Sequence, residues 1–520
     1  MLLSKLFSQV SLISLLASFL PDVLKGEKRA REEAHEIREA PKRAKIANLA
    51  PSDAGKPSFY RDLYKEDYLI DHRRACDDES PDVGEDLPPI SLQHAGFGHF
   101  LDIFHGLGHF SDTDEVSSRG IRMAVDIFAE KMSRYYLDEL GRRNVGLPAL
   151  KNVLSSRTDG LSLQLIPAKV GSVRSAGHVW GPHNALSCVA EFKNEAGGVS
   201  SIPYVEILGN FAHSTKAAAN KPDSASLMDA WNFPCLGITI VGKLCIMFAF
   251  PVHLPVMLGH QVTFYAMIYF GEWRVVSLTP SLSCIEHAGD GNERNALYDA
   301  FTAASVLLAC IHRDAKRLVE TSPRLSLTGR RRLPYISSLL HPDSQSRIEF
   351  QILDFFSKGT GRFLYVARTS KGKIIVKFTR RYSYDLHTFC AARGFAPKLL
   401  GFERLPGGFF GVAMEFFEDA SPFTEARGPK TAEWRRMLQE GVNSFHDAGL
   451  VHGDLRAPNI LCDGNKVMLI DFDWGGKQGE VFYPQGKLDV DLENERDVTN
   501  LKITFSDDRR VLYKTLSRIV

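Results

Sequence analysis

The chain has 520 residues, too many for one hydrophobic core, and this length predicts about three domains. Hydrophobic residues make up 44% of the chain, charged residues make up 24%, and the formal net charge is +1. This balance excludes any argument from overall charge for nucleic-acid or membrane binding. The eight cysteines are scattered without a C-x-x-C pair, which suits a reducing compartment and indicates neither a disulfide framework nor a cysteine zinc site.

Residues 1–24 combine one lysine with an apolar stretch. This layout is typical of a secretory signal peptide, and an amphipathic helix is the alternative. The stretch is too short to span a bilayer, and charges and prolines interrupt the later apolar run at 236–258. We therefore expect no membrane segment in the mature protein.

Residues 25–90 are polar, charged and rich in Pro, Asp and Glu, which predicts a mostly disordered arm with room for one helix. Two basic clusters, Lys28-Arg29 and Lys42-Arg43-Ala44-Lys45, resemble a bipartite nuclear-localisation signal. The alternative is a solvated charged helix, because acids are interspersed. The arm therefore predicts a nuclear location, preceded by secretion if the first 24 residues are cleaved.

Residues 91–155 have the periodicity of amphipathic helices, and residues 156–320 alternate strand-like apolar runs before a helix at about 293–318. Together, 91–320 predict a helical region plus an α/β domain with a buried sheet. In the run SCVAEFKNEA, Glu191 and Lys193 point to one face of an extended strand. Such a pair is costly to bury without a task, and a surface ion pair is the alternative.

After a linker at 321–344, the segment VHGDLRAPNILCDGNKVMLIDFD carries the strongest signal in the chain. Asp454 is followed by Asn459 and then by Asp471, between two short strand-like runs. This spacing provides one acid for an acceptor hydroxyl, and one amide and one acid for magnesium. Arg456 lies where a cation could reach a transferring phosphoryl group. The segment closely resembles the catalytic and metal-binding loops of protein kinases, with His-Gly-Asp in place of His-Arg-Asp.

Upstream, Lys377 lies within the β-branched strand KIIVKF, so its ammonium needs an anionic partner such as a phosphate or a carboxylate. The helix expected next, 382–393, stops at Gly394 and contains one acid, Asp385, which is the predicted partner. Gly359 and Gly361 in SKGTGR are candidates for a phosphate-covering loop, although a plain hairpin turn would look the same. The strand FGVAMEFFED predicts an adenine-facing hinge near Met414, with a core strand as the alternative.

Two departures from kinases bear on the acceptor. No arginine precedes Asp454, and few residues remain after the DFD motif, so residues 345–520 predict a bilobal kinase-like domain with a truncated large lobe. Asp473 replaces the last glycine of DFG, as in small-molecule phosphotransferases. The phosphoryl acceptor is therefore left open at this point.

Residues 95–510 resemble fungal kinase-like proteins in which a nuclease-like region precedes a short kinase domain, through the phrases EFKNE, CLGITIVG, HGDLR and DFDW. This order also resembles Crinkler-type secreted effectors. The resemblance implies a PD-(D/E)XK nuclease-like fold in which Glu191 and Lys193 act with an upstream acid, for which Asp159 is the candidate. It further implies contact with nucleic acid through the middle domain, residues 91–320.

The predicted architecture is thus multidomain, a nuclease-like α/β domain followed by an α+β kinase-like domain. The leading hypothesis is an ATP- and magnesium-dependent kinase acting on Ser or Thr of a protein substrate. Asp454 would orient the hydroxyl, Asn459 and Asp471 would hold magnesium, and Lys377, oriented by Asp385, would contact the phosphates. The alternatives are a metal-dependent nuclease regulated by the kinase-like domain, and a non-catalytic nuclear scaffold.

Overall fold

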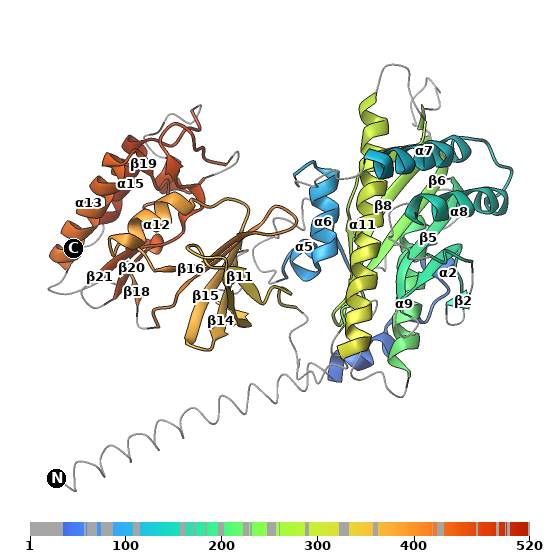
Figure 1. Cartoon of the computed structure of the whole chain (residues 1–520), viewed down its shortest axis with the longest axis horizontal. Coiled ribbons are helices and arrows are strands. Elements are labelled where there is room, and N and C mark those ends of the chain that lie inside the picture. The colour runs from blue at the N-terminus through green and yellow to red at the C-terminus, as the bar shows by residue number, and fades with distance from the viewer. Residues whose placement is uncertain are drawn as a thin grey trace, which may run out of the picture. The chain divides into compact units, whose positions relative to one another are not determined.

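The computed structural model divides the chain into two compact units, the first ending at Tyr335 and the second beginning at Ile336 (Figure 1). It describes residues 35–56, 59, 70–73, 87–107, 115–155, 163–167, 169–170, 173–181, 185–195, 202–221, 228, 231–246, 256–258, 260–285, 291–321, 332–356, 362–418, 420–423, 431–463, 466–484, 488–493, 496 and 500–517.

The first unit is built on a mixed sheet whose main strands run in the order β1-β9-β8-β6-β5-β4. Its two parallel contacts are β5 with β6 and β1 with β9, and the remaining neighbours are antiparallel. The strands are β1 (Ile70–Arg73), β4 (Gly177–Trp180), β5 (Leu186–Glu195), β6 (Cys235–Ile246), β8 (Gln261–Tyr269) and β9 (Trp273–Ser277), with β7 (Val256–Leu258) on β6, β10 (Leu282–Ser283) on β8, and β2 (Lys169–Val170) pairing with β3 (Val173–Arg174).

Helices cover both faces of this sheet. Successive residues of a strand point to opposite faces, and on β8 Phe264 packs edge-on against Phe301 of α11, whereas Tyr265 stacks on Tyr204 of α9. The α/β domain expected over this region is therefore present, with its sheet buried on both sides. The helices are α5 (Ile90–Gln93), α6 (Ala95–Phe104), α7 (Glu115–Met132), α8 (Glu139–Ser155), α9 (Pro203–Ala219) and α11 (Gly291–Thr321).

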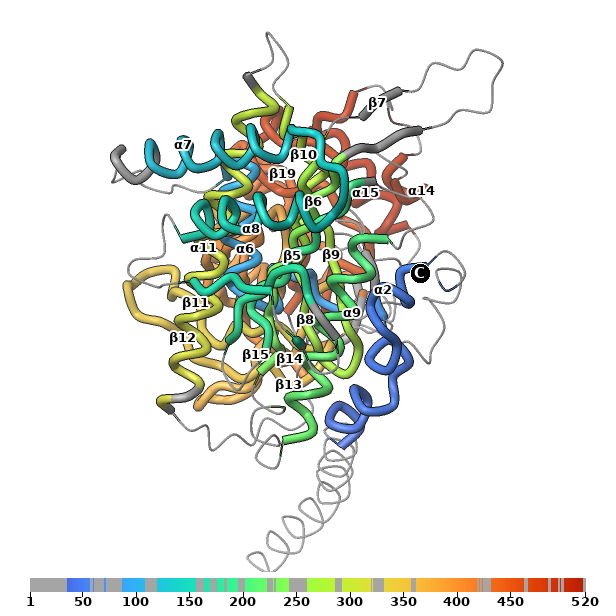
Figure 2. Tube along the Cα trace, turned by 90° about the vertical axis from the view of Figure 1, so that its right-hand side faces the viewer, coloured from blue at the N-terminus to red at the C-terminus, as the bar shows by residue number. Residues whose placement is uncertain are grey.

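Part of the arm expected to be disordered is instead packed into the first unit. Residues 35–43 are helical and are followed by η1 (Lys45–Ala47) and α2 (Pro51–Ala54), which lies beside α9 (Figure 2). Ile37 and Ala44 belong to the apolar core, and the Leu49 carbonyl contacts the His213 ring at 2.7 Å. The prediction is wrong here because apolar residues at helical spacing are buried while the charges stay outside.

The second basic cluster lies on this packed segment. Lys42 pairs with Glu39 at 2.7 Å and Arg43 with Glu36 at 2.8 Å, while Ala44 between the basic residues is buried. The first cluster, Lys28-Arg29, lies outside the described residues. Nuclear import through these clusters stays a prediction.

The second unit begins with a five-stranded antiparallel sheet in the order β13-β14-β15-β17-β16. The helix α12 (Tyr384–Ala392) follows β15 in the chain, and the side chain of Ser383 caps its first turn by accepting from the Leu386 amide. Gly394, at a φ of 79°, ends this helix as predicted. The strands are β11 (Ser338–Leu340), β12 (Arg347–Glu349), β13 (Gln351–Phe355), β14 (Phe363–Thr369), β15 (Gly372–Thr379), β16 (Leu399–Arg404) and β17 (Phe410–Glu415).

The rest of the second unit surrounds a separate apolar core. The threonine at 504 and Asp507 form a reciprocal cap at the start of its last helix, because the Asp507 carboxylate accepts from the Thr504 amide at 3.0 Å and the Asp507 amide donates to the Thr504 hydroxyl. The elements are α13 (Thr431–Asp447), α14 (Val490–Glu493), α15 (Phe505–Ser517), η5 (Ala457–Asn459), η6 (Phe472–Trp474), β18 (Ser421–Pro422), β19 (Leu450–Val451), β20 (Ile460–Asp463), β21 (Lys466–Leu469) and β22 (Gly476–Lys477).

Within the described residues, none of the helices combines the length and apolar character needed to cross a membrane.

Candidate active site in the C-terminal unit

The loop between β19 and η5 holds Asp454, which is 4% exposed. Arg456 donates two hydrogen bonds to its carboxylate, from Nε to Oδ1 at 2.6 Å and from Nη2 to Oδ2 at 2.8 Å. The Nη1 atom of Arg456 lies 2.7 Å from the Asp489 carboxylate. The Asn459 side-chain amide donates to the Asp454 carbonyl at 3.1 Å. Arg456 therefore fixes the direction of the Asp454 carboxylate, and the fork of a guanidinium is suited to this. The pKa of Arg456 is raised, mainly by its hydrogen bonds with Asp454.

A carboxylate from the last helix holds this loop in place. Asp508 of α15 is 1% exposed and accepts from the backbone amides of His452 and Gly453, each at 2.8 Å. The Tyr483 hydroxyl donates to the Gly453 carbonyl at 2.9 Å. Gly453 has a φ of 81° and so takes a left-handed conformation. The role of Asp508 was not predicted from the sequence, although the capping pattern TFSD signals the start of a helix beside it.

Lys377 and two aspartates of the DFD motif form the second half of the site. The Lys377 ammonium contacts Asp471 Oδ1 and lies 2.6 Å from Asp473 Oδ1. Asp473 Oδ2 accepts from the Thr379 hydroxyl at 3.1 Å, and Arg362 lies 3.1 Å from Asp471 Oδ2. The strand β15 supplies Lys377, which is 8% exposed, so its partners lie in a largely dry environment.

These contacts set opposite charge preferences for the two aspartates. Burial favours the neutral acid in both, but the charges of Lys377 and then Arg362 outweigh it at Asp471 and lower the pKa to about 2. At Asp473, burial and the neighbouring Asp471 charge prevail over Lys377 and raise the pKa to about 6. Burial also opposes the charge of Lys377, yet the two aspartates raise the pKa of its ammonium. Asp471 is therefore the firmly ionised member.

The backbone at Asp471 is left-handed, with φ 68° and ψ 64°, which is uncommon for a residue with a side chain. The next residue, Phe472, fixes the turn by stacking on the His387 ring at 4.6 Å and lying 5.2 Å from the His452 ring. Strained backbone of this kind is retained where the surroundings over-determine it, commonly at functional sites.

The two halves meet at Asn459. Its side chain contacts Asp454, and its carbonyl accepts from the Ile470 amide at 2.9 Å, directly before Asp471. Asn459 thus links the loop of Asp454 to the residue before Asp471, whose carboxylate contacts Lys377.

Asp385 does not pair with Lys377, contrary to the sequence prediction. It is exposed in the first turn of α12, and in the described part of the chain Lys377 forms ion pairs with Asp471 and Asp473. The inward residues of α12 are instead Leu386, His387 and Cys390. The helix therefore turns an imidazole, and not a carboxylate, toward the DFD loop.

The other predicted nucleotide contacts have different outcomes. Gly359 and Gly361 lie outside the described residues, so the phosphate-covering loop stays a prediction. Met414, 8% exposed, packs in an apolar cluster with Ile375 and Val412. Its contact with adenine stays a prediction as well.

The donor set suits a magnesium ion. Hard cations of this kind prefer carboxylate and amide oxygens. Asp471 offers an ionised carboxylate, and Asn459 is bonded through its carbonyl to the residue before Asp471. Within the described residues, no group of three or more His, Cys, Asp and Glu side chains is arranged to hold a metal unaided.

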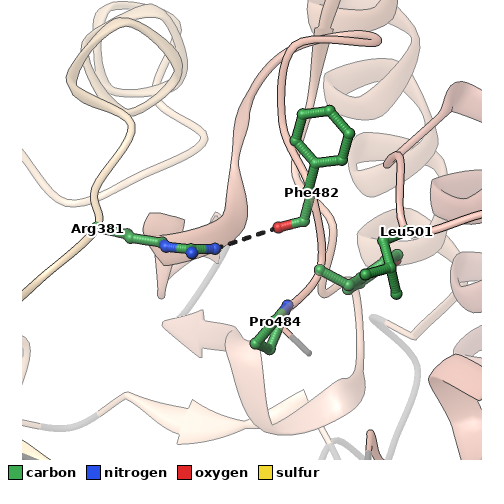
Figure 3. A pocket seen from close by; sticks show the side chains of 5 residues that line it. Arg381, Phe482, Pro484 and Leu501 are labelled. Carbon is green, nitrogen blue, oxygen red and sulfur yellow. Dashed lines mark hydrogen bonds between the residues drawn. The ribbon is translucent and has the colours of Figure 1, made fainter. Parts of the chain in front are cut away.

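A pocket lies on the segment that follows the DFD loop (Figure 3). Arg381, Phe482, Tyr483, Pro484 and Leu501 line it, and Arg381 donates to the Phe482 carbonyl at 3.5 Å. Tyr483 connects the pocket to the Asp454 loop through its bond to Gly453. The pocket thus offers an apolar wall and one cation beside the catalytic loop.

In the first unit, the structure brings Glu191 and Lys193 of β5 together with Glu206 of α9. The Lys193 ammonium lies 3.0 Å from Glu206 Oε1 and 3.3 Å from Glu139 Oε2. Both β5 residues are buried, so the surface ion pair that was the alternative is not what the structure shows. Asp159, the predicted third member, lies outside the described residues.

Comparison with known proteins identifies one family. Residues 350–481 match the sequence model of the family described as "RIO1: RIO domain". No curated protein matches the chain. The match lies wholly in the second unit, and its likeness is to atypical, protein-kinase-like proteins. The nuclease-like resemblance of the first unit therefore stays a prediction.

Solved kinase structures are similar to the chain at low identity. The Cydia pomonella granulovirus kinase PK-1 is 15% identical, with 33% of this chain and 70% of that chain covered and a TM-score of 0.29. Vaccinia related kinase 3 is 14% identical, with 36% and 68% covered and a TM-score of 0.27. Scores this low carry no argument by themselves. The RIO match and the arrangement of the site give the second unit a protein-kinase-like fold that supports ATP-dependent phosphotransfer.

Proposed function

We propose that the C-terminal unit is an ATP- and magnesium-dependent kinase that phosphorylates serine or threonine hydroxyls of a protein substrate. The observation that carries the proposal is the position of Asn459 between the two halves of the site. Asn459 bonds to Asp454 and to the residue before Asp471, and the Asp471 carboxylate contacts Lys377 of β15. A phosphotransferase needs a carboxylate at the acceptor, a metal site and a cation for the phosphates. These residues supply all three, although they are far apart in the sequence.

Each residue has a definite task in this mechanism. Asp454 accepts a hydrogen bond from the acceptor hydroxyl, which it can do while Arg456 holds it, because each carboxylate oxygen has two lone pairs. Asn459 and Asp471 hold magnesium, and Lys377 binds the α- and β-phosphates. Magnesium, when bound, supplies neutralising charge for the transferring phosphoryl group. Asp508 keeps the Asp454 loop in position through its two backbone bonds.

The test is phosphate transfer from labelled ATP by the purified full-length chain, onto itself and onto generic protein substrates, with magnesium. Wild-type protein is compared with Asp471→Ala and Asp454→Ala, and phosphoamino-acid analysis identifies the hydroxyl that is modified. Loss of transfer in both variants is expected. Transfer that persists in Asp454→Ala would refute this mechanism.

We propose metal-dependent cleavage of nucleic acid as a second candidate activity, in the first unit. The observation that favours it is the buried cluster of Glu191, Lys193 and Glu206, since burying such charges is costly without a task. The β5–α9–β6 connection between parallel strands presents Glu191 and Lys193 toward Glu206. The cluster thus contains the carboxylate and ammonium of the E-x-K pair.

Nicking of plasmid DNA and of RNA with magnesium or manganese tests this second activity. Lys193→Ala should abolish nicking, and Lys316→Ala, which removes an exposed lysine of α11, should not. Equal nicking by the wild type and Lys193→Ala would rule out the cluster as its source.

A further inference from the structure

Lys377 is held by two carboxylates, but these differ in what else they contact. The second oxygen of Asp471 faces Arg362, whose side chain is 53% exposed. The second oxygen of Asp473 accepts from Thr379, which lies on the same strand as Lys377, two residues further on. Asp473 is thus fixed to the β15 strand at both of its oxygens, whereas the second oxygen of Asp471 pairs with a largely exposed arginine.

We propose that Asp473 is the residue that positions Lys377 for nucleotide, replacing a carboxylate from helix α12. The inference rests on the proposed kinase function and names the partner that this lysine keeps during it. When Asp471 is committed to magnesium, Asp473 is the acid left beside the ammonium, and Thr379 holds it there. Lys377 therefore keeps a carboxylate partner that directs it at the phosphates, and this partner lies outside α12.

The helix itself supports this assignment. Asp385 is the single acid of α12, and it is exposed. The side chain that α12 turns toward the DFD loop is His387, which stacks on Phe472 and whose ring nitrogens contact Tyr382 Oη at 2.6 Å and the Pro397 carbonyl at 2.8 Å. The hydrogen bonds and the ring stacking described for this imidazole are thus made to groups other than Lys377.

This placement has a functional consequence. Where a helix carries the partner of the lysine, moving the helix switches the nucleotide site on and off. Here the lysine and both of its acids lie on β15 and on the loop after β21, which are joined by the bonds from Lys377 and Thr379 to Asp473. The structure therefore gives Lys377 a carboxylate partner that does not lie on α12.

The test compares two carboxylates in the full-length chain, Asp473 and Asp385. Binding of magnesium-ATP is measured by titration calorimetry, and KM and kcat for ATP are measured by phosphate transfer. Asp473→Asn should weaken binding by about 10- to 100-fold, the loss typical of a hydrogen bond between charged groups, and raise KM in proportion. Asp385→Asn should change binding by less than about threefold, as expected for an exposed charge. Asp473→Glu, which retains the charge, should recover binding relative to Asp473→Asn.

Recovery of binding in Asp473→Glu separates this role from a structural one, and thermal unfolding of each variant measures the stability lost when the buried pair with Lys377 is broken. Thr379→Val provides a second variant, expected to weaken binding less than Asp473→Asn. Wild-type affinity in Asp473→Asn, or an equal loss in Asp385→Asn, would overturn the proposal. Binding that depends on Asp473 without any phosphate transfer would support it while refuting the proposed function. A wild-type chain that does not bind magnesium-ATP would overturn both.

Discussion

Both units bury a lysine among carboxylates, but they leave their principal acids in opposite charge states. In the second unit, Lys377 and Arg362 outweigh burial at Asp471, and the pKa of this acid falls to about 2. In the first unit, burial and the neighbouring Glu206 charge outweigh Lys193 at Glu191, and the pKa of this acid rises to about 8. The ratio of cations to acids at each carboxylate decides the difference.

The consequence is chemical. A metal ligand must be deprotonated, so the second unit offers a carboxylate that is ready for magnesium at neutral pH. At the same pH Glu191 keeps its proton, and it would need the approach of a cation to release it. Of the two acids, Asp471 is therefore the better candidate for a metal ligand at neutral pH.

The largest effect is expected from Asp454→Asn, because it removes the carboxylate at the acceptor and keeps the shape of the side chain. General-base contributions are typically 10²–10⁴-fold, so transfer should fall by about that factor. Binding of magnesium-ATP should persist, because Lys377 and Asp471 are untouched. Transfer by rapid quench and binding by calorimetry check the two halves separately.

Unchanged transfer by Asp454→Asn would contradict the comparison, because Asp454 would then not be the acid that acts on the acceptor hydroxyl in the second unit. Asp447→Asn, an exposed acid at the end of α13, is the matched control and should leave both quantities unaltered.

The next effect in size is a loss of stability in Asp508→Ala. The substitution leaves the buried amides of His452 and Gly453 without their acceptor, so the free energy of unfolding should fall by about 3–5 kcal/mol. Urea denaturation with a probe in the second unit measures it. A loss below about 0.5 kcal/mol, the range of ordinary surface substitutions, would show that the catalytic loop does not depend on α15.

The local parts of the active site could be read from the sequence. The catalytic loop, the lysine on a β-branched strand and the helix ending at Gly394 all follow from spacing and turn chemistry, and the structure contains each of them. What those patterns encode is a set of short segments, each placed by its own neighbours.

The partners between segments could not be read in the same way. Asp473 lies 96 residues from Lys377, and Asp508 lies 55 residues from Gly453. Which of several acids faces a buried lysine depends on how the sheet and loops pack, so Asp385 was the nearest candidate in sequence and the wrong one. The burial of Ile37 and Ala44 had a visible signal in their helical spacing, which the surrounding charges outweighed.

The pH dependence of the first unit sharpens the comparison further. Native Glu191, with a pKa of about 8, holds a proton that the unfolded chain releases around the ordinary glutamate pKa of 4.5. The contribution of this group to stability is therefore fully present below that pH and is lost as the pH rises to about 8. Hydrogen exchange at peptides of β5 should accelerate between pH 5.5 and 8.5, after correction for the intrinsic rate.

Glu191→Gln should flatten this dependence, because an amide does not titrate. A variant that keeps the full wild-type slope would show that another group holds the proton, and the charge contrast between the two lysine clusters would disappear.

The smallest effect should come from Tyr483→Phe. The substitution removes one buried hydrogen bond to the Gly453 carbonyl and keeps the ring, so the free energy of unfolding should fall by about 0.5–1.5 kcal/mol. Asp508 still fixes the backbone on the amide side, and kcat should therefore fall far less than in Asp508→Ala. Equal effects of the two variants on kcat would mean that the pocket wall contributes as much as α15 to the position of Asp454. Tyr483 would carry this effect, because it lines the pocket and bonds to the Gly453 carbonyl.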